Sequence, residues 1–319
     1  MRFLLRLVLV LTSALLLAAD DDGAERLMKA GRADEALRTL NVQIQENPRD
    51  AAAYNLLCRT YYQLELWDTA MLMAEKSIAL DPRNSLYHQW LGRAAGRKAE
   101  VSNPFTAFNL ARKVRAEFER AVALDGDNIS ARSDLSEYYL EAPGFLGGDK
   151  NKARQQADAI APHDPALARY IIARVEEKKH TGRAEEEYKK AIEVSTNDAA
   201  RYWIELASYY RRSGRLPEME SAILQSLAAT RHKAVPEFDG AAMLRDAGRN
   251  FPGAIQMLRS YLAGDPVSED APAFQAHYLL GQIFEKQGDR RSAQEQYRAA
   301  MELASQFRPA RDALTRVSR

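Results

Sequence analysis

The residues that suggest chemistry are few, and the densest group lies between positions 141 and 150. Gly144, Gly147, Gly148 and Lys150 are the residue types of a phosphate-binding loop. Their order does not fit one, because an aspartate separates the last glycine from the lysine, no serine or threonine follows the lysine, and no strand pattern precedes the segment. The alternative hypothesis for the function is therefore a small-ligand receptor or an enzyme with its site near this loop.

An enlarged turn between two helices explains the same segment. Pro143 and Gly144 favour a bend, and Asp149 is a good N-cap for a following helix. We expect Phe145 and Leu146 to fold back onto neighbouring helices. Because an apolar loop that no repeat requires is a natural place for a specialised contact, both are candidate partner-binding residues.

Other reactive side chains do not form a constellation. No histidine lies three or four residues from another histidine or from a cysteine, so metal-ligand spacing is absent. Cys58 is the only cysteine, and we expect it to be a buried packing residue, not a reactive thiol. Glu137 and Glu141 lie one helical turn apart, which is usual for solvated charges. We expect no catalytic residue, no cofactor and no metal.

The element that recurs along the chain is a helical hairpin, seen clearly in the 34 residues 51–84. Two apolar stripes of helical period are separated by a turn, and a proline follows the second. Their residues are Tyr54, Leu57, Cys58 and Tyr61, then Ala70, Ala74, Ser77 and Leu80, with Pro82 at the end. One such hairpin is too thin to bury its own core, so neighbouring hairpins must stack on it.

The hairpin returns, in altered form, to the end of the chain. The best copies are residues 200–233 and 274–307, with Trp203, Leu206, Ala207, Tyr210 and Gly214 in the first and His277, Leu280, Gly281, Phe284, Gly288, Ala293, Tyr297 and Ala300 in the second. These residues resemble the tetratricopeptide repeat pattern, W-x2-L-G-x2-Y followed by A-x3-F-x2-A and a late proline.

That resemblance implies an all-α fold, a right-handed α-solenoid of about eight stacked hairpins with a C-terminal capping helix. The expected units are residues 20–50, 51–84, 85–128, 129–164, 165–198, 199–233, 234–268 and 269–305, with the cap at 306–319. Insertions are expected near residues 98–108 and 142–149. The first insertion either lengthens the helices of its unit or forms a lobe.

The resemblance also implies a concave groove lined by the first helix of each hairpin. The candidate partner-binding residues there are Asn55, Arg59, Tyr62, Gln89, Arg93 and Arg97. Arg59 and Arg93 occupy the same position of consecutive units, so we expect them to stack and to receive a carboxylate or a peptide backbone. A solvated charged face balanced by Glu137 and Glu141 is an equally open interpretation.

The first 19 residues follow a different pattern. Arg2 and Arg6 precede an apolar run of 13 residues from Leu7 to Ala19, and three aspartates follow it. This predicts a signal peptide at residues 1–19 and a periplasmic or secreted protein. An uncleaved N-terminal anchor is the alternative, and membrane contact is expected only in that case.

Charge composition narrows the range of partners. Lys and Arg number 45 and Asp and Glu number 44, so the chain has no global field that would attract nucleic acid. The sequence therefore predicts a non-catalytic scaffold of the cell envelope that binds protein partners or peptide segments in its groove.

Overall fold

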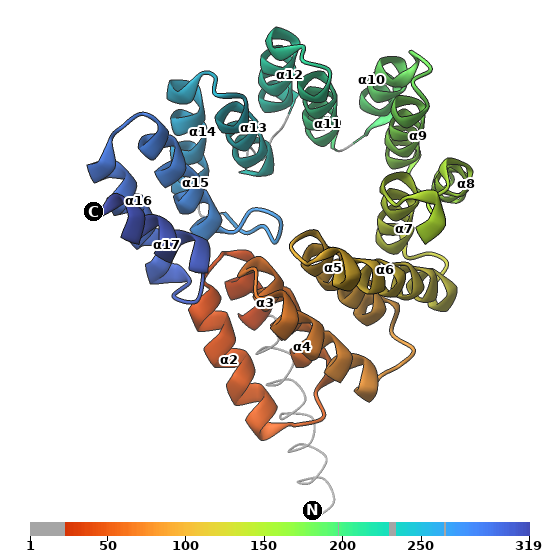
Figure 1. The fold of residues 1–319 in the computed structure, drawn as a ribbon, viewed down its shortest axis with the longest axis horizontal. Coiled ribbons are helices and arrows are strands. Elements are labelled where there is room, and N and C mark those ends of the chain that lie inside the picture. Colours follow the sequence, from red (N-terminus) through yellow and green to blue (C-terminus); the bar gives the residue numbers. More distant parts are fainter. Residues whose placement is uncertain (1–22, 197, 230–233, 265) are drawn as a thin grey trace, which may run out of the picture. The chain divides into compact units, whose positions relative to one another are not determined.

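The computed structural model describes residues 23–196, 198–229, 234–264 and 266–319, and all regular secondary structure in these ranges is helical (Figure 1). The all-α prediction is confirmed. The predicted signal peptide lies outside the described residues. Within the described ranges, no helix has both the length and the apolar character needed to cross a membrane.

The chain forms two compact units. Unit 1 combines the described residues of Met1–Leu66 with those of Asp265–Arg319, and unit 2 is Trp67–Gly264. Whether residues 20–319 form one continuous solenoid stays a prediction.

Unit 1 joins the two ends of the chain. Its helices are residues 23–29, α2 (Ala33–Glu46), α3 (Ala51–Gln63), α15 (Ala273–Lys286), α16 (Arg290–Leu303) and α17 (Arg308–Val317). The Ser268 N–H donates to the Lys29 carbonyl over 2.8 Å. A Cβ on Gly31 would lie 2.3 Å from the backbone nitrogen of Ala273, so only glycine permits this approach.

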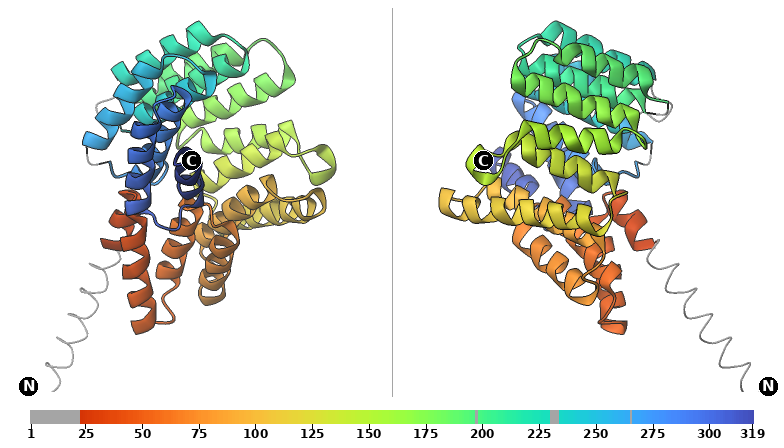
Figure 2. Two further views of the ribbon diagram at one scale, coloured as in Figure 1. Left: turned by 60° about the vertical axis from the view of Figure 1, so that its left-hand side comes forward. Right: turned by 90° about the vertical axis from the view of Figure 1, so that its right-hand side faces the viewer.

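Unit 2 is a row of antiparallel helical hairpins, and Figure 2 shows consecutive hairpins stacked on one another. After α4 (Trp67–Leu80) the hairpins are α5 (Ser85–Glu100) with α6 (Pro104–Leu124), α7 (Ile129–Glu141) with α8 (Lys150–Ile160), α9 (Pro165–Lys179) with α10 (Ala184–Val194), α11 (Ala199–Arg212) with α12 (Leu216–Ala229), and α13 (Ala234–Ala247) with α14 (Phe251–Ala263).

Small residues allow the two helices of a hairpin to approach closely. A Cβ on Gly92 of α5 would lie 2.4 Å from the ring of Phe118 of α6, and one on Gly281 of α15 would lie 2.5 Å from the ring of Tyr297 of α16. Each aromatic ring fills the space that a side chain would need. Cys58 is fully buried, as predicted.

The expected insertion near residues 98–108 lengthens helices and forms no separate lobe. Helix α5 has 16 residues and α6 has 21, and Asn103 caps α6 by accepting a hydrogen bond from the Thr106 N–H. Pro104 at the first turn suits this start, because that position needs no N–H donor. Helix α6 is therefore long enough to run past the loop that follows α7.

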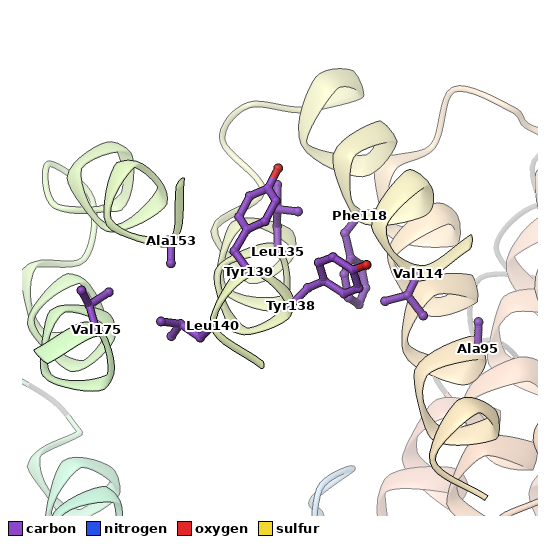
Figure 3. Packing of buried hydrophobic residues seen from close by; sticks show 9 residues of the cluster. All are labelled: Ala95, Val114, Phe118, Leu135, Tyr138, Tyr139, Leu140, Ala153 and Val175. Atoms are coloured by element: carbon purple, nitrogen blue, oxygen red, sulfur yellow. The ribbon is translucent and has the colours of Figure 1, made fainter. Parts of the chain in front are cut away.

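The core beside this loop connects three successive hairpins. Tyr138 of α7 lies against Phe118 and Val114 of α6, while Leu140 points toward Val175 of α9 (Figure 3). These buried contacts hold α7 against both neighbours, and α7 in turn holds the loop that follows it.

Candidate functional site

Arg59, which was predicted to line the groove, forms ion pairs within unit 1. Its side chain donates to both carboxylate oxygens of Glu269 over 2.7 Å each and to Glu25 over 2.9 Å. Only 9% of Arg59 is exposed. Burial alone would lower the pKa of Arg59, but the two carboxylates raise it. Arg59 thus holds the two chain ends of unit 1 together, and its role in binding another protein stays a prediction.

The remaining candidates in unit 1 differ in exposure. Asn55 is buried, and Tyr62 is partly exposed. Because Arg59 lies in unit 1 and Arg93 in unit 2, their stacking stays a prediction as well.

In unit 2, Gln89 and Arg93 connect two hairpins. The Gln89 amide donates to Ser130 and Asp134 over 2.7 Å each, and Arg93 Nε donates to Asp134 over 2.6 Å. These bonds join α5 to α7. Arg97 is exposed, pairs with Glu100 of its own helix, and lies 5.4 Å from the centre of the Trp67 ring.

The acidic side chains expected to balance these arginines have other partners. Arg174 of α9 donates to Glu137 over 3.0 Å and to Glu141 over 2.7 Å, and Lys178 donates to Glu141 over 2.7 Å. The charged side chains of unit 2 therefore pair from one hairpin to the next. Such pairs position the helices, and Arg97 is the most exposed of the predicted groove residues in this unit.

The loop after α7 is ordered by hydrogen bonds from its own hairpin. A short 3-10 helix, η1 (Gly144–Leu146), follows Pro143. The Tyr138 hydroxyl donates to the Leu146 carbonyl over 2.9 Å, and the Asp149 N–H donates to the Tyr139 carbonyl over 2.9 Å. Asp149 accepts from the Asn151 N–H over 2.8 Å, so its predicted N-cap role is confirmed.

Two adjacent glycines are required by this geometry. Gly147 has φ +93°, and a Cβ there would lie 2.4 Å from a guanidinium nitrogen of Arg115. A Cβ on Gly148 would lie 1.7 Å from the Ala142 carbonyl oxygen. The glycine pair therefore allows the loop to pack closely against α6 and α7. This structural requirement explains the two glycines that also suggested a phosphate-binding loop.

Phe145 contacts the neighbouring helix α6, as expected, but 80% of the residue stays exposed. The Phe145 ring stacks on that of Phe108 at a centroid distance of 6.5 Å and an interplanar angle of 12°. Phe108 is 40% exposed and Phe105, one turn away, is 79% exposed. We call Phe105, Phe108 and Phe145 the aromatic patch.

A cavity of about 430 Å³ adjoins the aromatic patch. It is lined by Phe108, Arg112, Arg115, Ala116 and Glu119 of α6 and by Phe145 and Leu146 of η1. Arg115 Nε donates to Glu119 over 2.8 Å, and the Tyr139 hydroxyl donates to the same carboxylate oxygen over 2.9 Å. Burial and this hydrogen bond raise the pKa of Tyr139 to about 12, so the phenol keeps its proton at neutral pH.

This arrangement is suited to contact with another molecule. One exposed aromatic ring lies on a loop fixed by hydrogen bonds and two lie on α6, and arginine side chains border the cavity between η1 and α6. In the described part of the chain, no group of three or more His, Cys, Asp or Glu could hold a metal ion. Phe145 and Leu146 were predicted from the sequence as contact residues, whereas Phe105, Phe108 and Arg112 were not. Their spacing along one face of α6 was the available signal.

Helical hairpins stacked in sequence order define an α-solenoid. Two models of the tetratricopeptide repeat match the chain, one over residues 27–94 and the other over residues 274–307. These two segments belong to the tetratricopeptide repeat family. Proteins of this family are generally non-catalytic scaffolds that bind other proteins.

Solved structures show the same fold. A thermophilic tetratricopeptide repeat protein of Thermus thermophilus is 21% identical, with a TM-score of 0.50, over 60% of this chain and 97% of its own. Yeast Tom70 is 15% identical, with a TM-score of 0.54, over 90% of this chain and 58% of its own. At these identities the likeness concerns the fold alone.

Proposed function

We propose that this protein is a non-catalytic protein-interaction scaffold that holds a partner at the aromatic patch and the adjoining cavity. The observation that carries the proposal is the exposure of Phe145 on a loop that Tyr138, Tyr139 and two obligatory glycines keep in place. A binding surface that is already ordered in the free protein does not lose conformational entropy by becoming ordered when the partner binds.

Burial of the aromatic patch favours a protein partner. Removing a phenylalanine side chain from water stabilises a complex by about 2 kcal/mol, and three such rings stand within one patch. Interfaces commonly depend on a few aromatic anchors and arginines near their centre. Phe145, Phe108 and Arg112 are residues of these types lining one cavity.

A matched pair of substitutions tests this proposal. The immobilised full chain is exposed to an extract of its own cells, and captured proteins are compared for Phe145→Ser and Leu224→Ser. Leu224 is a similarly exposed apolar residue on α12, so both variants lose one exposed apolar side chain. We expect Phe145→Ser to weaken capture about tenfold or more and Leu224→Ser to leave it unchanged. Equal capture by both variants would contradict the proposal.

Binding of peptide segments in the concave groove is a second mode that the family resemblance supports. Arg97, Arg93 and Tyr62 are the candidate residues there that keep exposed surface. If the groove is the principal site, Arg97→Ala weakens capture and Phe145→Ser does not.

We also propose that the protein acts in the cell envelope or outside the cell. The support is the basic start and the 13-residue apolar run that ends at Ala19. Sequencing the N-terminus of the protein purified from its native cells tests this. A chain beginning near Asp20 agrees with the proposal, and retention of Met1 in a cytoplasmic fraction contradicts it.

A further inference from the structure

The cavity beside the aromatic patch has a positive rim that the protein does not itself neutralise. Two arginines and one glutamate line it, a net charge of +1. Arg115 donates to Glu119, so these two charges are paired. Arg112 is exposed and makes no hydrogen bond or ion pair with the described part of the chain.

Arg112 stands where it can act together with the aromatic rings. It lies one turn from Phe108 on the same face of α6, and both line the cavity with Phe145. An apolar side chain inserted into the cavity beside the rings would therefore bring its neighbouring residue toward the guanidinium. A carboxylate at that point would form a charge-assisted and geometrically specific contact.

We infer that this surface selects an acidic protein segment, in which an apolar residue that enters the cavity stands next to an aspartate or glutamate. The inference rests on the proposed function and adds the chemistry of the partner. Charge disfavours a second copy of the chain as the occupant. Helix α6 carries four basic residues (Arg112, Lys113, Arg115 and Arg120) and two acidic ones (Glu117 and Glu119), a net charge of +2. A two-fold contact would bring like charges together.

The test uses two labelled synthetic peptides, Gly-Ser-Phe-Glu-Glu-Leu-Ser-Gly and its counterpart with lysines in place of the glutamates. Fluorescence anisotropy measures their binding to the full chain and to three variants. Phe145→Ser removes a wall of the cavity, and Arg112→Glu reverses the rim charge. Arg120→Glu reverses a charge on the same helix at an exposed residue that does not line the cavity.

We expect the acidic peptide to bind the native chain at least about tenfold more tightly than the lysine peptide. Arg112→Glu should reverse that preference, Phe145→Ser should weaken both peptides, and Arg120→Glu should behave like the native chain. Equal binding of the two peptides, or equal effects of Arg112→Glu and Arg120→Glu, would overturn the inference. A dimer in sedimentation that Phe145→Ser converts to a monomer would also overturn it, because a second copy would then be the occupant.

The same variants separate this inference from the proposed function. If Phe145→Ser abolishes capture of the cellular partner and Arg112→Glu does not alter it, the scaffold proposal stands and the acidic-segment inference is wrong. If neither variant alters capture, both are wrong.

Discussion

At the scale of single residues, Arg59 pairs with two carboxylates within unit 1. Its removal should therefore lower the stability of the protein more than it affects binding. Arg59→Met leaves Glu269 and Glu25 without their cation in a largely buried site. We expect a loss of about 2 kcal/mol in the free energy of unfolding, below the full cost of breaking a buried pair because both carboxylates keep some solvent contact.

Urea unfolding followed by circular dichroism measures this loss. Arg97→Met is the matched control, because Arg97 is exposed and its ion-pair partner, Glu100, lies on its own helix. It should change the free energy of unfolding by about 0.5 kcal/mol or less. Equal effects of the two substitutions would show that the Arg59 contacts do not stabilise unit 1.

The pKa of Glu185 predicts how the stability of the protein depends on pH. Hydrogen bonds from Lys189, Arg215 and Tyr210 outweigh burial and lower the pKa of Glu185 from its ordinary 4.5 to about 2. The contribution of Glu185 to stability is therefore fully present above about pH 4.5 and is lost as pH falls from there toward 2.

The difference in unfolding free energy between the native chain and Glu185→Gln should accordingly be large near pH 7 and vanish near pH 2. Glu193→Gln is the control, since Glu193 is exposed on the same helix and has no hydrogen-bond partner among the described residues. A Glu185→Gln difference that stays constant with pH would contradict the assigned hydrogen bonds.

At the scale of elements, the η1 loop depends on Gly148. In Gly148→Ala the new methyl group would overlap the Ala142 carbonyl oxygen, so the loop must shift and the Tyr138–Leu146 and Asp149–Tyr139 hydrogen bonds weaken. We expect a cost of about 2 kcal/mol or more. Gly144→Ala is the control, because a Cβ on Gly144 meets no atom within 4 Å.

Hydrogen exchange at the Asp149 amide reports on this loop directly. It should accelerate strongly in Gly148→Ala and little in Gly144→Ala. Similar exchange in both variants would show that the loop does not require the glycine pair.

Local features of these elements were predictable because they depend on neighbouring residues. The two helices predicted within residues 51–84 are present as α3 and α4, and Asp149 caps α8 as expected. The stacking of Phe145 on Phe108 was not predictable from the loop that carries Phe145. It depends on the length of α6, which places Phe108 beside η1 although 37 positions separate the two phenylalanines in the chain.

Ion pairs between residues far apart in the sequence were not predictable either. The spacing of Arg59 within its repeat indicated an accessible groove residue. Its partner Glu269 lies 210 positions away, and repeat periodicity does not specify which distant carboxylate reaches an arginine. The same holds for Asp134, which binds Arg93 from the next hairpin.

At the scale of the whole molecule, unit 1 makes the two ends of the chain one packed body. Amides of α2 and α3 should then exchange with the same opening free energy as those of α15 and α16, because the two segments open together. Arg59→Met should lower both values equally, and Arg97→Met should lower neither. A change confined to α2 and α3 would contradict cooperative opening of the unit.

Docking of a protein partner on the aromatic patch can be tested by photo-crosslinking in living cells, with p-benzoylphenylalanine replacing Phe145, Arg97 or Leu224 in turn. We expect a discrete crosslinked adduct from position 145 and none from position 224 on α12. An adduct from position 97 alone would place the partner in the groove, and equal labelling from all three positions would contradict a specific docking surface.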